Sequence, residues 1–411
     1  MKRLVSLIAC VVLSTGLLVG CVSQSSNDPL TQKLSFDKEK IDAGVVNSNS
    51  GFALEIFKKL NNEDKKENIF ISPLSISAAL TMAYQGSGST TRDAMAKALG
   101  YEGLAIEQIN ESYKNLIRYL VQVDKKVQLN ISNSIWIRDG ETVREDFLSL
   151  NKDVFNARAE ALDFSKESSV NEINNWISNS TKGKIQKVID SPIPDDTIMY
   201  LINAIYFKGQ WTEQFDKKKT FSSKFQTDDG SKQEVMMMNR KGDIEYGQGE
   251  DFKVVRLPYG SGKTSMYCIL PGEDTSINDF IEGMDINKWK TIKESVSKTE
   301  DVILQLPRFK TEYGIKNLKD SLTALGMGEA FSEQADFSGI SEDVSISRVL
   351  HKAVIEVNEE GSEAAGVTVV EMNKLAVMDP ITFIADRPFI FLITDDETGS
   401  ILFMGKLYDV G

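Results

Sequence analysis

One patternless stretch near the C-terminus most limits what this chain can fold into. It runs over residues 359–380, reads EEGSEAAGVTVVEMNKLAVMDP, and lies between two apolar, strand-like runs. Its front half consists mainly of small residues, and its back half has neither a helical nor a strand period. A segment of this length without a structure of its own is uncommon inside a compact domain and is usually functional or disordered. We interpret it as an exposed functional loop, with a front half whose small residues could fit into a β-sheet.

The rest of the chain predicts an α+β fold, with helices early and strands late. Ser72 and Pro73 form a helix-start signal, and the apolar residues 74–84 that follow predict a buried helix. Because no Pro/Ser-rich linker and no repeat follows residue 50, we predict a single domain over residues 49–411. Residues 197–207 are too apolar for an edge strand and predict a central one. Alternating patterns and apolar runs predict further strands over residues 127–137, 349–357, 381–385, 389–394 and 401–407.

The N-terminal residues indicate a targeting segment followed by a tether. Lys2 and Arg3 precede an apolar run over residues 4–19, and the sequence Leu18-Val19-Gly20-Cys21 follows. This ending resembles the lipobox of prokaryotic lipoproteins, in which cleavage precedes the cysteine and the cysteine is acylated. The alternative is a plain secretory signal with an incidental cysteine. We therefore predict a signal peptide over residues 1–20, and an acylated Cys21 with a flexible tether over residues 21–48. The protein would be secreted and lipid-anchored, on the outer side of the cytoplasmic membrane or in the cell envelope.

Charge and composition argue against several classes of function. The net charge of −13 offers no attraction to phosphate, so neither nucleic acid nor a heparin-like polyanion is an expected partner. The only histidine, His351, lies on the apolar face of a predicted strand, which argues against a histidine-dependent hydrolase. Residues 260–264 (GSGKT) look like the end of a phosphate loop, but Leu257 stands where the first glycine is required. Without an HExxH or CxxC motif, we expect neither a metal site nor a cofactor. Cys268 lies in an apolar strand run, so we expect a buried free thiol.

Six motifs occur in a fixed order along the domain. They are NIFISPLSI (68–76), LINAIYFKGQW (201–211), VLHKA (349–353), NEEGSEAAG (358–366), RPFIFLI (387–393) and LFMGK (402–406). Each motif is moderately specific, and together in this order they resemble the serpin family of protease inhibitors over about residues 50–408. The resemblance implies a fold of three β-sheets and eight or nine helices, with an exposed reactive-centre loop over about residues 359–380.

The resemblance also assigns structural roles to single residues. Asn203 and His351 would form a polar shutter under the central sheet, with Ser72 and Ser75 nearby.

A second group of residues would lie at the breach, where the loop first enters the sheet. The family's pattern places Trp211, Arg308 and Glu359 there. The plainer alternative for Trp211 is ordinary core packing. For Arg308 with Glu359 it is a surface ion pair, worth at most about 1 kcal/mol.

The loop's front half would act as a hinge, with the members Glu359, Gly361, Ser362, Ala364, Ala365 and Gly366. A strand can insert only if alternate side chains fit the core beneath it. Counting from Ser362, the inward side chains would be Ser362, Ala364, Gly366, Thr368, Val370 and Met372, and none of them is charged. Glu363 and Glu371 would point outward, where water can solvate them, whereas burying either carboxylate unpaired would cost several kcal/mol. This composition favours an inhibitor over a non-inhibitory serpin acting as a binding or scaffold protein.

The resemblance implies a suicide-substrate inhibitor of serine proteases, with cysteine proteases as a second candidate class. The family places the cleaved bond about seventeen residues past the hinge glutamate. This count gives Leu375–Ala376, which suits a protease of chymotrypsin-like or subtilisin-like specificity. If the count slips by one residue, Lys374 becomes the reactive residue and the target becomes trypsin-like. We expect a monomer that contacts the membrane only through its lipid.

Overall fold

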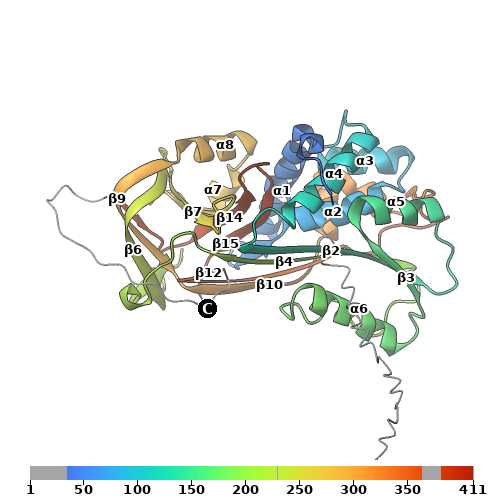
Figure 1. Cartoon of the computed structure of the whole chain (residues 1–411). Helices are drawn as coiled ribbons and strands as arrows, with labels where there is room; N and C mark the ends of the chain where they lie inside the picture. The colour runs from blue at the N-terminus through green and yellow to red at the C-terminus, as the bar shows by residue number, and fades with distance from the viewer. Residues whose placement is uncertain (1–34, 229, 363–380, 411) are drawn as a thin grey trace, which may run out of the picture. The chain divides into compact units, whose positions relative to one another are not determined.

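The structure is a computed structural model, and it describes residues 35–228, 230–362 and 381–410. The described part contains nine α-helices, which agrees with the expected eight or nine. Six of them precede the central strand β4, as the early helix patterns predict (Figure 1). The helices are α1 (Ala43–Glu63), α2 (Pro73–Tyr84), α3 (Ser89–Leu99), α4 (Ile106–Leu120), α5 (Glu145–Phe155), α6 (Glu167–Ser180), α7 (Ile277–Glu282), α8 (Ile286–Ser295) and α9 (Lys319–Leu322).

Helix α2 begins where the sequence predicts. The Ser72 side chain accepts a hydrogen bond from the Ser75 amide, which satisfies one of the free N–H groups of the first turn. Pro73 occupies the first turn, where its missing N–H is not needed. Of the twelve residues of α2, all except Ala79 are buried, so this helix is part of the core.

A six-stranded sheet forms the frame of the candidate site. Its two interior strands β4 and β2 pair antiparallel along their whole length, from Met199↔Ile137 to Gly209↔Val127. Strand β4 is interior, as its uniformly apolar sequence predicts. The strand order is β10 (Phe309–Asn317), β11 (Leu350–Asn358), β12 (Gly361–Ser362), β4 (Met199–Gln210), β2 (Val127–Arg138) and β3 (Arg158–Leu162).

The remaining described strands form one nine-stranded hydrogen-bonded network. The network follows the order β1 (Ile69–Ile71), β15 (Ile401–Leu407), β14 (Phe389–Asp395), β8 (Thr264–Pro271), β7 (Phe252–Tyr259), β6 (Lys232–Gln248), β9 (Ser297–Pro307) and β13 (Thr382–Ile384), with β5 (Phe221–Gln226) paired to β6. The expected three sheets therefore appear as two networks among the described residues. The long strand β6 is the cause, because it pairs with β5 near its start, with β9 along most of the rest of its length and with β7 near its end.

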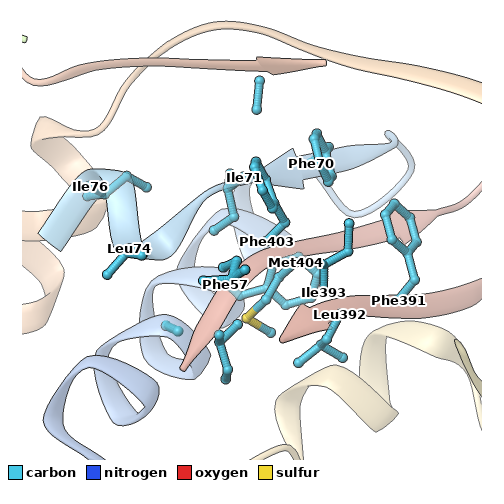
Figure 2. Close-up of a cluster of buried hydrophobic side chains, with 14 of the residues drawn as sticks. Phe57, Phe70, Ile71, Leu74, Ile76, Phe391, Leu392, Ile393, Phe403 and Met404 are labelled. Carbon is cyan, nitrogen blue, oxygen red and sulfur yellow. The ribbon is translucent and has the colours of Figure 1, made fainter. Parts of the chain in front are cut away.

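The main core lies between the helices and both sheets. Figure 2 shows Phe70 of β1 among the side chains of β14 and β15. The ring of Phe70 stacks on Phe391 and on Phe403, at centroid distances of 5.7 and 5.4 Å. Cys268, on β8, is a buried free thiol as predicted, and burial raises its pKa.

Helix α6 lies on the opposite face of the six-stranded sheet from α2, α4 and α5 (Figure 1). It covers a second apolar cluster that includes Trp136, Ile173 and Ile177. The segment that follows α6 adds Ile185, Ile189 and Ile193 to this cluster, and partly buried side chains from both β4 and β11 pack against it. The segment therefore lies over the boundary between β4 and β11.

Among the described residues, the folded unit begins before residue 49, the predicted start of the domain. Helix α1 begins at Ala43, and the folded unit includes residues from Ser35 onward. The Asp42 side chain accepts a hydrogen bond from the Val45 amide and caps the helix, and Val45 and Val46 are buried. Residues 35–48 are thus not tether. The predicted signal peptide and Cys21 lie outside the described residues.

Candidate functional site

The front of the predicted loop lies inside the six-stranded sheet. The chain leaves β11 at Asn358, turns through Glu359 and Glu360, and returns as β12. On one side β12 pairs with β11, through Val357↔Ser362 and Asn358↔Gly361. On the other side it pairs with β4, through Gly361↔Gln210 and Ser362↔Gly209. The Ser362 side chain is 1% exposed, so it points inward as the alternation predicts. The other predicted hinge residues (Ala364, Ala365, Gly366) and the reactive-bond candidates (Lys374, Leu375, Ala376) lie outside the described residues.

Gly361 is required at the point where three strands approach each other. Its φ of +146° is disfavoured for residues with a side chain. A Cβ atom at this position would lie 2.1 Å from the carbonyl oxygen of Gly209. Glycine is therefore needed here for the chain to turn into the sheet beside Gly209.

Trp211 holds the turn between β11 and β12 by two hydrogen bonds. Its indole Nε1–H donates to the carbonyl of Asn358, and its backbone N–H donates to the carbonyl of Glu360, both at 2.9 Å. The Phe215 amide donates to the carbonyl of Glu359 at 2.9 Å. Trp211 also packs in the core, which was the alternative role, because its ring stacks on Tyr259 with a centroid distance of 4.4 Å.

Two consecutive buried carboxylates follow β11. Glu359 is 1% exposed, and its Oε1 accepts hydrogen bonds from Arg308 Nε at 2.7 Å and from the Thr220 hydroxyl at 2.5 Å. Burial acts to raise the pKa of Glu359, but the hydrogen bonds from Arg308 and Thr220 outweigh burial and hold the pKa below its usual range. Because the carboxylate is buried, the alternative of a plain surface ion pair does not describe this contact.

The second carboxylate, Glu360, has a partner that the sequence did not reveal. It is 2% exposed, and its Oε1 lies 2.5 Å from Lys217 Nζ. Lys217 belongs to a run of three lysines, and such a run usually forms a solvated face. Nothing local in the sequence indicates that one of them reaches a buried carboxylate.

The four predicted shutter residues lie together at the N-terminus of α2. The Ser72 amide donates to His351 Nε2 at 3.1 Å, and the Ser75 hydroxyl donates to Asn203 Oδ1. His351 and Asn203 are therefore both attached to the first turn of the same helix. Burial lowers the pKa of His351 to about 4, so the imidazole is neutral near pH 7 and can accept this hydrogen bond.

Asn133 on β2 is a further member of this polar group. Its Oδ1 accepts a hydrogen bond from Asn203 Nδ2 at 2.7 Å, and its own Nδ2 donates to the carbonyl of Phe155. A signal was present in the sequence. Asn133 is the one polar residue on the inward face of an otherwise apolar alternating strand, and a buried amide in such a place needs partners.

Below β12, strands β4 and β11 do not pair with each other in the described part of the chain. A cavity of about 280 Å³ lies there, lined by Met199–Asn203 of β4, by Leu350 and His351 of β11 and by residues of α2. Val188 and Ile189, from the segment after α6, also line it. We call the space between β4 and β11 below β12 the gap. Three of the shutter residues (Ser75, Asn203 and His351) line the cavity, and β12 lies at the upper end of the gap.

The described ranges hold no cluster of three or more His, Cys, Asp or Glu side chains arranged to bind a metal ion. Nor does any helix within them have the length and apolar character needed to cross a bilayer.

Comparisons with known proteins agree with this geometry. The family model described as "Serpin (serine protease inhibitor)" matches residues 47–410. The chain is 35% identical to intracellular coagulation inhibitor 2 of Tachypleus tridentatus, over 92% of this chain and 95% of that relative. It is 34% identical to human neuroserpin, over 86% of this chain and 89% of that relative.

Solved structures show the same fold. The native state of the thermophilic serpin tengpin matches with a TM-score of 0.82 and 33% identity, over 92% of this chain and 96% of that one. Human thyroxine-binding globulin in complex with its ligand matches with a TM-score of 0.81 and 31% identity, over 89% of this chain and 98% of that one. The family model covers most of the chain and the relatives match over most of their length. The chain therefore belongs to the serpin family.

Proposed function

We propose that the protein is a suicide-substrate inhibitor of serine proteases, with cysteine proteases as a second target class. It would trap the acyl-enzyme by inserting its cleaved loop between β4 and β11. Loop insertion is the established inhibitory mechanism of this family. The observation that carries the proposal is the pairing of Gly361 and Ser362 between these two strands, directly above an unfilled gap.

The register of β12 predicts where the rest of the loop would go. Ser362 pairs with Val357 of β11 and with Gly209 of β4. Thr368 is six residues after Ser362, and the residues six positions before Val357 and Gly209 are His351 and Asn203. If β12 continued in this register, Thr368 would lie between the two shutter side chains. The alternation that points Ser362 inward also points Thr368 inward, so its hydroxyl would meet their polar groups.

The length of β4 limits the inserted strand. Its first residue, Met199, corresponds to Met372 in the same register. Residues 363–372 would fill the gap and leave a cleaved bond at Leu375–Ala376 just beyond the end of the sheet. The uncharged inward side chains, which run from Ser362 to Met372, therefore match the part of the loop that would be buried.

Insertion would defeat the protease by displacing its catalytic groups. The protease first attacks the loop and forms an ester with the reactive residue. Hydrolysis of that ester needs the nucleophile, the base and the oxyanion hole in register. Strand formation would drag the attached protease along the sheet, distort the site and leave the ester intact.

Leu375 as the reactive residue would select proteases with an apolar specificity pocket, of the chymotrypsin or subtilisin kind. Lys374 as the reactive residue would select trypsin-like proteases. The test is to incubate the purified protein with subtilisin, chymotrypsin and trypsin, and to analyse the products on denaturing gels and by mass spectrometry. We expect a complex that survives denaturant and a C-terminal peptide that starts at Ala376. A peptide that starts at Leu375 would assign the reactive residue to Lys374.

Cleavage in the loop without a stable complex for any of the three proteases would overturn the inhibitor proposal. It would favour a non-inhibitory serpin acting as a binding or scaffold protein. Thyroxine-binding globulin, which binds thyroxine, shows that a serpin fold can hold a ligand. The partly inserted hinge and its uncharged inward residues favour the inhibitor.

We further propose that the mature protein is a lipid-anchored monomer, held at the cell envelope by acylated Cys21. The sequence Leu18-Val19-Gly20-Cys21 supports this proposal. Fatty-acid labelling and detergent phase partition test it. The natural protein should enter the detergent phase, and the Cys21→Ala variant should not. Equal partition of both would contradict the anchor.

A further inference from the structure

The side chain of Tyr259 lies directly beneath the hinge and is fully buried. Its ring is fixed between Trp211, stacked at 4.4 Å, and Phe207, which meets it edge-on at 5.0 Å. A Cβ atom at Gly209 would lie 2.8 Å from the ring, so the neighbouring strand also packs closely against it. The position of the tyrosine hydroxyl is therefore determined by its surroundings.

That hydroxyl lies 2.8 Å from Ser362 Oγ. Among the described residues, neither group has another hydrogen-bonding partner, and both side chains are buried. If Ser362 left the sheet, the Tyr259 hydroxyl would lose its partner in a site closed to water. An unpaired buried polar group costs free energy, so this hydrogen bond favours the inserted position of Ser362.

The other contacts of the hinge act on earlier residues. Trp211 and Phe215 donate hydrogen bonds to the carbonyls of Asn358, Glu359 and Glu360. Arg308 and Lys217 bind the carboxylates of Glu359 and Glu360. None of these contacts reaches Ser362, and they can persist whether or not Ser362 is in the sheet. Apart from the strand pairing itself, the Tyr259 hydrogen bond is the contact that depends on insertion.

We propose that Tyr259 is a positioning residue that recognises a hydroxyl group at position 362 and holds the first inward residue of the loop in the sheet before cleavage. We call this contact the Tyr259–Ser362 latch. The inference rests on the proposed function, because it defines the point from which the cleaved loop continues into the gap. It also explains why a small hydroxyl residue stands at this position, where alanine would fit the space but leave Tyr259 unpaired.

Hydrogen exchange of the uncleaved protein, read by mass spectrometry on peptides that contain Gly361 and Ser362, tests the latch. We expect the Tyr259→Phe and Ser362→Ala variants to exchange about tenfold faster at these amides. Ser362→Thr keeps the hydroxyl and should keep the protection. The double variant should exchange no faster than either single variant, because both remove the same hydrogen bond. Gly361→Ala, which clashes with Gly209, provides a reference for an expelled hinge.

Tyr246→Phe is a matched control, because Tyr246 is a buried tyrosine on β6 whose hydroxyl donates to Gln248 instead. It should leave exchange at Gly361 and Ser362 unchanged. If Tyr259→Phe folds poorly, the contrast between Ser362→Ala and Ser362→Thr still decides the question. Wild-type protection in both Tyr259→Phe and Ser362→Ala, or equal loss in Ser362→Ala and Ser362→Thr, would overturn the latch. No protease is used, so failure of the latch is separate from failure to trap a protease.

Discussion

At the residue scale, burial decides which form of His351 the protein contains. The imidazole is 6% exposed and accepts a hydrogen bond from the Ser72 amide at the start of α2. A protonated imidazole could not accept this bond, and it would bring a charge into the core. The neutral form is therefore part of the folded structure and joins β11 to the helix beneath it.

This arrangement predicts that stability falls on acidification. The pKa of His351 lies near 4 in the folded protein and near 6.5 in the unfolded chain. Between these values the unfolded chain binds a proton that the folded protein does not, so stability is lost as the pH falls from about 6.5 to about 4. The loss attributable to His351 is on the order of 3 kcal/mol. Urea unfolding of the natural protein and of His351→Asn between pH 7 and pH 4 measures it. Parallel stability curves for the two proteins would contradict the prediction.

At the element scale, the segment between α6 and β4 acts as a cover over the gap. Asn174 of α6 attaches this segment by three hydrogen bonds: its Nδ2 donates to the carbonyl of Ile189, and its Oδ1 accepts from the amides of Val188 and Ile189. Val188 and Ile189 line the cavity below β12. In the proposed mechanism, a strand that enters between β4 and β11 would have to displace this segment, so Asn174 would contribute to the barrier against insertion.

We expect Asn174→Ala to loosen the cover locally. The substitution leaves two amides and one carbonyl without their partner, at a cost of about 2 kcal/mol. Hydrogen exchange at Val188 and Ile189 should become faster by about tenfold or more, with β2 and β4 unaffected. Asn151→Ala is the matched control, since Asn151 is a buried asparagine that bonds within α5. Unchanged exchange at residues 188 and 189 in the Asn174 variant would show that Asn174 does not hold the cover.

At the scale of the whole molecule, the uncleaved protein leaves its six-stranded sheet open between two interior strands. Strands β4 and β11 are held apart below β12, and a cavity of about 280 Å³ remains between them. Exposed residues such as Asp343 and Arg348 line this cavity, so it is open to solvent, and the side chains of Met199–Asn203 are only partly buried there. The fold therefore retains free energy that a strand of suitable composition could release.

Cleavage in the loop should raise the thermal stability of the whole protein. A new interior strand would add backbone hydrogen bonds on both sides and cover partly exposed apolar side chains, which contributes on the order of 5 kcal/mol and corresponds, for a domain of this size, to a rise in Tm of roughly 6 °C. Differential scanning calorimetry before and after a single cut near Leu375 measures the change. Thr368→Asp would bring a charge between Asn203 and His351 and should remove most of the gain, whereas Glu371→Gln, on the outward face, should keep it. An unchanged Tm in the cleaved natural protein would contradict insertion.

Short-range patterns predicted much of this architecture. The capping signal of Ser72 and Pro73 located α2, and alternation placed His351 and Ser362 on inward faces. The same rules could have found the true start of α1, since Asp42 precedes Val45 and Val46 at helical spacing. These features follow from interactions between residues a few positions apart, and such interactions can be read from the sequence directly.

The sequence by itself determined the α+β class, the main elements and the uncharged composition of the loop's inward face, and its resemblance to the serpin family supplied the shutter and breach candidates. Only the tertiary structure decided that Gly361 and Ser362 already lie in the sheet, that Lys217 binds Glu360, and that Tyr259 bonds Ser362. Tyr259 and Ser362 are 103 positions apart in the chain. Contacts at that range depend on how the strands are ordered and on where the core leaves space. Those conditions are set by packing across the whole domain, and no local pattern encodes them.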